Sequence, residues 1–290
     1  MVLSIRAPGG VESSWGVRTD DALIYQCERC GLRFRRPPSR DEIERYYGAS
    51  YHDKMVGGEQ DQHREVVHRL ENEDRIRYLQ RFRSGGKVLD VGCSLGHFAD
   101  QLRAAGFDAH GSDISSYACS KAVELIGRDR VHPGPVESFA GELEQSLDVV
   151  TMMDVIEHFG DVNGPLTSIW RMLKPGGILF LRTPTLNSPF HRVAEWSLAL
   201  SRGHYKDAIL KLYHAEHLFF FDEKSIRALL ESLGYEVVAI DPDPLLWDNF
   251  RSAEMRQGPL LNAALAAIWA AGRALNLGHG MKVIARRPVT

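Results

Sequence analysis

The chain has 290 residues, which corresponds to about two average domains or to one large domain with insertions. Apolar residues make up 44% and charged residues 25%, which excludes a chain disordered throughout, a collagen-like chain and a coiled coil. The 35 basic and 38 acidic residues leave a net charge of -3, which argues against nucleic-acid binding through overall charge. Four cysteines are too few for a disulfide scaffold, and the first residues lack the pattern of a signal peptide, so we expect a cytoplasmic protein.

Residues 1–60 differ in composition from residues 61–290, which we expect to form one domain. The first part holds a Cys-x-x-Cys pair, Cys27 and Cys30, and a basic run from Arg33 to Arg40. We expect continuous regular structure to begin near Asp61, where apolar residues start to recur at helical spacing.

From residue 87 onward, short apolar runs alternate with helical segments. The expected strands cover 87–91, 108–112, 147–152, 178–182, 236–240 and 281–285, and the expected helices cover 95–105, 116–126, 166–173 and a segment that begins after Asp222. This alternation predicts an α/β fold in which a parallel sheet carries helices on both faces.

Two long stretches interrupt this rhythm, at about 184–221 and 241–280, and we expect both to be insertions that decorate the sheet. The second contains an apolar, alanine-rich run from Ala263 to Gly272. At 10 residues it is shorter than the roughly 20 that a membrane-spanning helix needs. A helix buried in its own domain is one expectation, and a peripheral membrane contact or a homodimer contact through residues 260–275 is the alternative.

A strand, a small-residue turn and a helix start follow one another over residues 88–98. Gly92 and Gly96 allow a ligand close to bare backbone, and Asp113 ends the next strand, where a carboxylate can accept hydrogen bonds from ribose hydroxyls. The dinucleotide fingerprint fails because Ser94 and His97 stand where it needs glycine. The segment instead resembles the Asp-x-Gly-x-Gly-x-Gly signature of class I S-adenosylmethionine-dependent methyltransferases, with Ser94 in place of the middle glycine.

The resemblance continues along the chain in the order that this superfamily shows. Residues 147–158 resemble its fourth-strand motif, residues 173–184 resemble the entry to its fifth strand, and residues 217–221 resemble the approach to its final hairpin. Together the matches cover about residues 86–240. The resemblance implies a Rossmann-like seven-stranded sheet, parallel with a terminal antiparallel hairpin, and S-adenosylmethionine as cofactor.

Carried over to this sequence, the resemblance implies a set of cofactor-binding residues. The methionine end of the cofactor would be lined by Asp90, Gly92, Cys93, Ser94 and Gly96. Asp113 would hold the ribose and Ile114 would pack on the adenine. Val136 and Glu137 would lie beside the adenine edge, and Met153 and Asp154 would flank the sulfonium.

An oxygen nucleophile needs a base or a metal ion to remove its proton. Asp154, Glu157, His158 and His217 are the candidates, and His158 is the first choice because it follows the fourth strand of the motif series. Asp154-x-x-Glu157-His158 with His217 also resembles the metal-binding set of small-RNA 2′-O-methyltransferases and some quinone O-methyltransferases. That alternative implies Mg²⁺ or Mn²⁺ as a second cofactor.

The Cys27 and Cys30 pair, with the residues around it, resembles the second half of a zinc-ribbon module that precedes some methyltransferase domains. A structural zinc needs four ligands, and no cysteine or histidine precedes Cys27. We therefore expect a degenerate ribbon without zinc, with Tyr46, Tyr47 and Tyr51 packed over the mouth of the site.

The leading hypothesis is a methyltransferase that acts on a small-molecule or glycan biosynthetic intermediate, with O-methylation favoured over C-methylation. A metal-dependent RNA 2′-O-methyltransferase is the first alternative, in which Arg33, Arg35, Arg36 and Arg40 would hold phosphates. A binding module that keeps the cofactor fold without catalysis is the second.

Overall fold

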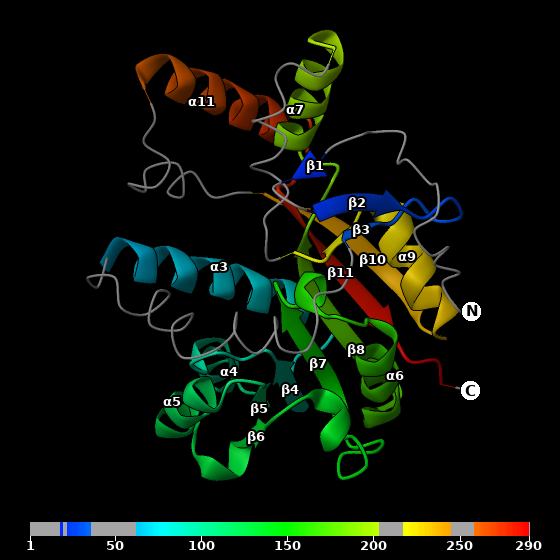
Figure 1. Cartoon of the computed structure of the whole chain (residues 1–290). Coiled ribbons are helices and arrows are strands. Elements are labelled where there is room, and N and C mark those ends of the chain that lie inside the picture. The colour runs from blue at the N-terminus through cyan, green and yellow to red at the C-terminus, as the bar shows by residue number, and fades with distance from the viewer. Residues whose placement is uncertain (1–17, 20–21, 36–61, 203–216, 245–257, 290) are drawn as a thin grey trace.

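The computed structural model describes residues 18–19, 22–35, 62–202, 217–244 and 258–289 (Figure 1). The predicted aromatic cover of Tyr46, Tyr47 and Tyr51 lies outside these residues. So do Arg36 and Arg40 of the basic run.

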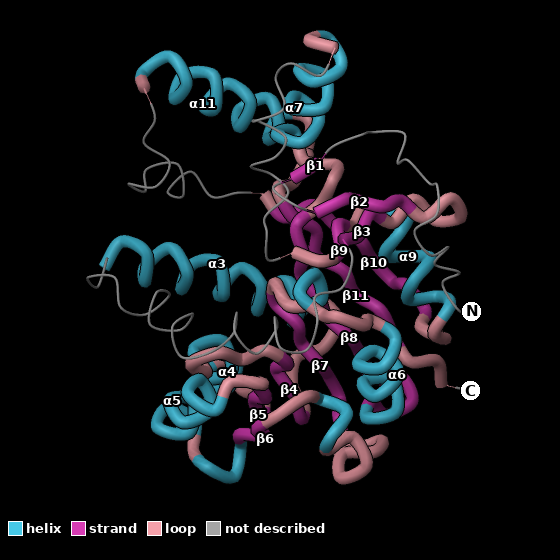
Figure 2. The backbone as a smooth tube through the Cα atoms, viewed as in Figure 1, coloured by secondary structure: helices cyan, strands magenta, loops and turns pink. Residues whose placement is uncertain are grey.

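A seven-stranded sheet forms the centre of the molecule (Figures 1 and 2). Its strands are β4 (Lys87–Val91), β5 (Asp108–Asp113), β6 (Val131–Pro133), β7 (Leu147–Met153), β8 (Leu173–Pro184), β10 (Glu236–Asp243) and β11 (Gly280–Arg286). They lie in the order β10-β11-β8-β7-β4-β5-β6, and β11 is antiparallel to both of its neighbours. The predicted Rossmann-like sheet with a terminal antiparallel hairpin is confirmed.

Helices cover both faces because successive strand residues point to opposite sides of the sheet. Val88 packs in the core on one face and Leu89 in the core on the other. The first face is covered by α3 (Gln62–Gln80), α4 (His97–Ala104) and α5 (Ser116–Ile126), and the second by α6 (Asn163–Met172) and α9 (Glu223–Ser232) (Figure 1). The result is a three-layer sandwich with two apolar cores.

A second, smaller sheet lies against one end of the sandwich. It pairs β1 (Arg18–Thr19), β2 (Ala22–Gln26) and β3 (Arg33–Arg35) with β9 (Phe219–Phe220), in the order β1-β2-β3-β9. The helix expected to begin near Asp61 is α3, which begins at Gln62, and the sequence pattern does not predict the short strands that precede it. These strands are too short to show a period, and β3 is completed by a strand that lies far along the chain.

Two further helices stand outside the three layers (Figure 1). Helix α7 (Pro189–Leu200) follows β8, and helix α11 (Pro259–Ala274) precedes β11. They touch each other, and a Cβ added to Gly272 would lie 2.7 Å from Cγ of Pro189. None of the helices in the described residues is both long enough and apolar enough to cross a bilayer.

Candidate active site

The loop after β4 is a tight turn that is held by backbone hydrogen bonds. Gly92 has a φ of 73°, and a Cβ on it would lie 2.5 Å from Cγ2 of Val155. The amides of Gly92 and Cys93 both donate to the carbonyl of Ser112, at 2.8 and 2.9 Å. Only glycine satisfies both the positive φ and the close approach of Val155.

Ser94, which replaces the expected middle glycine, adopts a φ of 49° and is exposed. Its amide donates to Oδ2 of Asp113 at 2.9 Å, and the amide of Ser115 donates to Oδ1 at 2.8 Å. The Asp113 carboxylate thus ties the loop after β4 to the start of α5. The serine thus adopts the left-handed backbone conformation that glycine adopts more readily.

Asp90 lies beneath this loop and is almost completely buried. Its Oδ1 accepts a hydrogen bond from Oγ1 of Thr151 at 2.7 Å. Burial raises the pKa of Asp90 to about 7, and the nearby Asp113 charge adds to the rise. A positive group that approached this carboxylate would favour its ionised form.

The other residues expected near the cofactor differ in exposure. Ile114, directly after β5, is 56% exposed, so its side chain is available to pack against a flat ring. Met153 is partly exposed at the end of β7, whereas Val136 is buried and Glu137 is exposed in the short helix η2 (Val136–Ser138). Cys93 is buried, and burial raises the pKa of its thiol, so it packs as an apolar group.

At the end of β7, Asp154 has a φ of 59° and is held by two arginines. One is Arg182 of β8, which forms an ion pair with Oδ1, and the other is Arg75 of α3, whose Nη2 lies 3.4 Å from Oδ2. Nε of Arg182 also donates to Oδ2 of Asp243 at 2.8 Å. Helix α3 is thereby linked to β7, β8 and β10 through one chain of charges.

Although burial opposes it, the charges of Arg182 and Arg75 hold the pKa of Asp154 below its usual value. Its carboxylate is therefore ionised and already paired. The structure divides the predicted catalytic set of four residues: Asp154 pairs with two arginines, whereas the other three lie close enough together to share one ligand. The charge of Asp154 still acts on Glu157 and His158.

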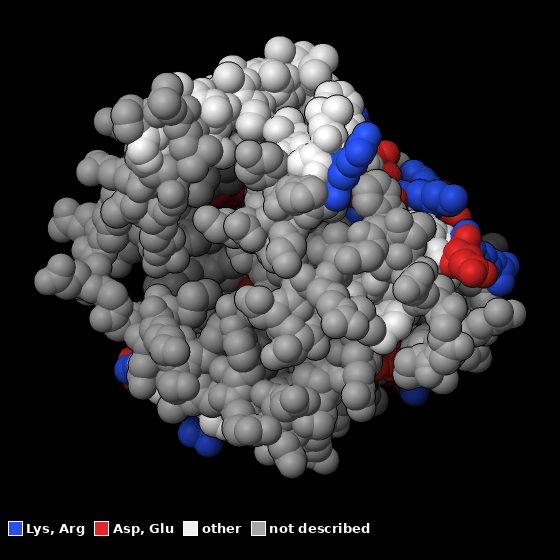
Figure 3. Space-filling view, turned by 45° about the horizontal axis from the view of Figure 1, so that its top comes forward, with Lys and Arg blue, Asp and Glu red and all other residues white. Residues whose placement is uncertain are grey.

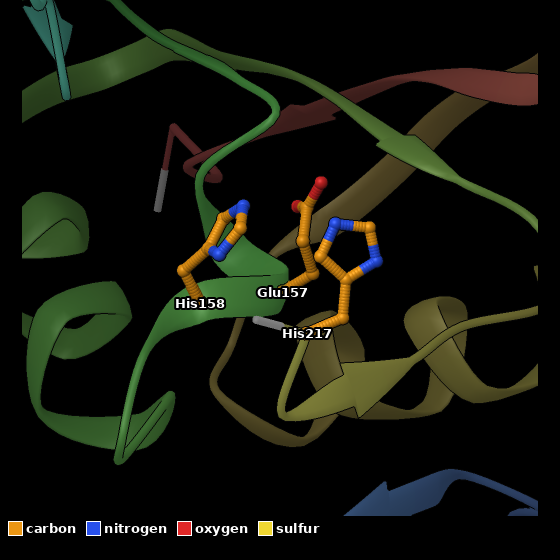
Figure 4. A group of neighbouring side chains, drawn as sticks. All are labelled: Glu157, His158 and His217. Carbon is orange, nitrogen blue, oxygen red and sulfur yellow. The ribbon is translucent and has the colours of Figure 1, made fainter. Parts of the chain in front are cut away.

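That cluster consists of Glu157 and His158 of the short helix η3 (Ile156–His158), with His217 just before β9. One oxygen or nitrogen atom from each side chain lies within 4.8 Å of the other two. The imidazole rings meet edge to face with centroids 4.9 Å apart, and the carboxylate lies between them (Figure 4).

Glu157 is the buried member of the cluster. Its Oε2 accepts a hydrogen bond from Oγ1 of Thr183 at 2.9 Å, whereas its Oε1 has no hydrogen-bond partner among the described residues. Burial, followed by the charge of Asp154, raises the pKa of Glu157 to about 8. The group can therefore hold a proton near neutral pH.

Backbone hydrogen bonds connect the small sheet to this cluster. The amide of Arg35 donates to the carbonyl of Leu218, and the amide of Leu218 donates to the carbonyl of Glu157, at 2.8 and 2.7 Å. The segment that carries His217 is therefore fixed between η3 and β3.

The described arginines of the basic run point into the protein. Arg33 forms a 2.7 Å ion pair with Glu195 of α7, and Arg35 is 7% exposed with its guanidinium over the ring of Phe220. Neither side chain is placed to contact the phosphates of a nucleic acid, so these two arginines do not support the RNA hypothesis.

Cys27 and Cys30 lie on the turn between β2 and β3, and both are free thiols. Cys30 is buried in the core, and no third metal-ligating side chain in the described part of the chain joins the pair. The zinc-ribbon interpretation stays a prediction.

Arg75, Arg182, Thr151 and Thr183 are site residues that sequence reasoning missed. The sequence offers a clue to Arg182, because a charged residue at the end of the apolar run 178–182 is unexpected in a buried strand. It offers no clue to Arg75, since this residue is one of many charged residues on a long helix.

The chain matches the family model of a methyltransferase domain over residues 62–240. It is 30% identical over 177 residues to the ubiquinone biosynthesis O-methyltransferase of Proteus mirabilis, a match that covers 56% of this chain and 70% of that protein. It is 31% identical over 130 residues to the malonyl-[acyl-carrier protein] O-methyltransferase of Erwinia billingiae, with coverage of 45% and 51%. The chain thus spans about half the length of some curated relatives.

Among solved structures, an S-adenosylmethionine-dependent methyltransferase from Archaeoglobus fulgidus superposes with a TM-score of 0.55 at 19% identity. The match covers 82% of this chain and 98% of that one. At this identity the comparison supports the fold alone.

Proposed function

Because this chain belongs to the family of S-adenosylmethionine-dependent methyltransferases, we propose that it methylates an oxygen atom of a small biosynthetic molecule. The observation that carries the proposal is the Glu157, His158 and His217 cluster, which lies just beyond the end of β7. The names of the two relatives, both O-methyltransferases, support an oxygen acceptor. A glycan hydroxyl remains within the proposed acceptor class.

The cofactor supplies an activated methyl group on its sulfonium. The loop at Gly92, Ser94 and Gly96 would accept its methionine end against bare backbone, with Asp90 beneath to balance the ammonium charge. Asp113 would receive the ribose hydroxyls, in competition with the two amides that it holds in the free protein. Ile114 would support the adenine.

Proton removal from the acceptor would fall to the cluster. A hydroxyl is a weak nucleophile until a base takes its proton, and imidazole has a suitable pKa near neutrality. His217 and His158 are the base candidates, and Glu157 would orient an imidazole and share the proton. Asp154, paired with Arg182 and Arg75, would instead fix the shape of the acceptor end of the site.

A divalent cation is the second way in which the same cluster could activate a hydroxyl. The donor set of one carboxylate and two imidazoles fits Mn²⁺ well and Mg²⁺ less well. Oε1 of Glu157 is a buried acceptor that has no hydrogen-bond partner in the described part of the chain. These three residues would hold the ion, and the ion would lower the pKa of the acceptor hydroxyl.

The test measures transfer of a radiolabelled methyl group to three acceptors: a catechol, an aliphatic carboxylic acid and a sugar. With the catechol, we expect His217→Ala to lower kcat about 100-fold while the affinity for S-adenosylhomocysteine, measured by calorimetry, stays unchanged. His68→Ala on the exposed face of α3 is the control. A carboxylic acid is ionised at neutral pH, so its methylation should not depend on His217.

Chelation by EDTA with recovery on addition of Mn²⁺ would favour the cation, and full activity in EDTA would favour the imidazole base. Transfer to amines alone, or a catechol activity that His158→Ala and His217→Ala both leave intact, would contradict the proposal.

A further inference from the structure

Helices α7 and α11 form an arm that projects from the sandwich on the side of the active site (Figures 1 and 2). Helix α7 leaves the carboxyl end of β8, and its base is tied to the His217 segment because the amide of Leu186 donates to the carbonyl of Phe221 at 2.8 Å. The two helices pack closely where Pro189 meets Gly272. The arm therefore has a fixed base beside the site.

The outer side of α7 is apolar where a surface helix is normally polar. Val193, Trp196 and Leu200 are spaced by three and four residues, so they lie on one face, and they are 43%, 70% and 86% exposed. Leu275, just after α11, is 69% exposed. Val193, Trp196 and Leu200 thus give α7 an exposed apolar face, which a helix that meets only water usually lacks.

The net charge of the described part of the arm is positive. The sequences of α7 and α11 contain one acid, Glu195, and its carboxylate is neutralised by Arg33 at 2.7 Å. Arg192 on α7, Arg202 just beyond it and Arg273 on α11 are exposed. In Figure 3 the described surface at the top of the view is mostly uncharged, and both basic and acidic side chains lie at its edge.

We propose that this arm docks on an anionic lipid surface. Exposed aliphatic and tryptophan side chains would enter the interface between headgroups and acyl chains, and the three arginines would contact anionic headgroups. A second copy of the chain would meet the same arginines and have few acids to offer in return if it bound through the same face. Charge complementarity therefore favours anionic lipid.

The experiment is sedimentation of the purified chain with two kinds of vesicle. One kind contains phosphatidylcholine alone, and the other contains phosphatidylcholine with about 30% phosphatidylglycerol. We expect binding to the mixed vesicles, at least 10-fold weaker binding to neutral ones, and release by salt because the contacts are partly electrostatic. The double variant Trp196→Ser with Leu200→Ser should bind at least 10-fold more weakly. The control, Leu125→Ser, changes an exposed leucine of α5 and should bind like the unmodified chain.

Each variant is first titrated with S-adenosylhomocysteine, so that lost vesicle binding is not confused with misfolding or with a failed cofactor site. As a second measurement, brominated lipids should quench tryptophan fluorescence less in Trp196→Phe, which keeps an apolar ring. Equal binding to both kinds of vesicle, or none to either, would overturn the proposal. So would a dimer in light scattering that the double variant alone dissociates.

Discussion

Two parts of the same sheet edge are built in different ways. At the ends of β4 and β5 the proposed cofactor half centres on a backbone turn, with Gly92 close to Val155 and the amide of Ser94 bonded to the Asp113 carboxylate. At the ends of β7 and β8 the proposed acceptor half consists of charged and titratable side chains. These come from segments as distant as α3, η3 and the stretch before β9.

The difference shows how each half can change. The turn after β4 tolerates few substitutions because Gly92 combines a positive φ with a close neighbour, and this turn is the proposed binding surface. A cluster of side chains can be altered one group at a time without a change in the backbone. The following predictions test whether cofactor binding and catalysis can be impaired independently of each other.

The largest effect is expected for Gly92→Ala in the cofactor half. A Cβ would lie 2.5 Å from Val155, so the loop must move, and we expect the Kd for S-adenosylhomocysteine to rise about 100-fold, or about 3 kcal/mol. Gly106→Ala is the control, since its φ of 94° is also positive but no atom lies within 4 Å of the added Cβ. Calorimetry measures both. Equal losses in the two variants would show that backbone strain, and not the contact with Val155, is responsible.

A smaller effect is expected for Arg75→Gln in the acceptor half. Asp154 would keep Arg182 but lose its link to α3, so kcat with a catechol should fall about 10-fold, with little change in cofactor Kd. Arg69→Gln on the same helix is the control, because its ion pair with Glu73 is exposed. If Arg75→Gln weakened cofactor binding as much as catalysis, the two halves would be coupled through α3.

The smallest effect is expected for Asp90→Asn, measured as stability in urea without cofactor. The pKa of Asp90 is about 7 in the folded chain and about 3.8 unfolded. The folded form therefore binds the proton more tightly, and stability falls as pH rises from about 4 to about 7. Asparagine removes this loss, so we expect the free energy of unfolding of the variant to exceed that of the unmodified chain more at pH 8 than at pH 5. An equal difference at both pH values would contradict the assignment.

Local pattern was enough for the elements of the central sheet. The apolar run expected over 147–152 is β7 (Leu147–Met153), and the helix expected over 116–126 is α5 (Ser116–Ile126). The spacing of apolar residues that marks a strand or a helix lies within one short segment, so these elements can be predicted without knowledge of the fold. The small sheet was missed because β3 is completed by β9, which no local period can reveal.

The sequence by itself determined the fold class, the family resemblance and the position of the glycine loop, because a strand, a turn and a helix start are set by neighbouring residues. Only the tertiary structure decided that Asp154 pairs with Arg75 and Arg182 while Glu157, His158 and His217 form a separate cluster. It also decided that Arg33 and Arg35 point inward and that Trp196 and Leu200 point outward. Each of these outcomes depends on contacts between segments distant in sequence, and such contacts exist only once the chain has folded.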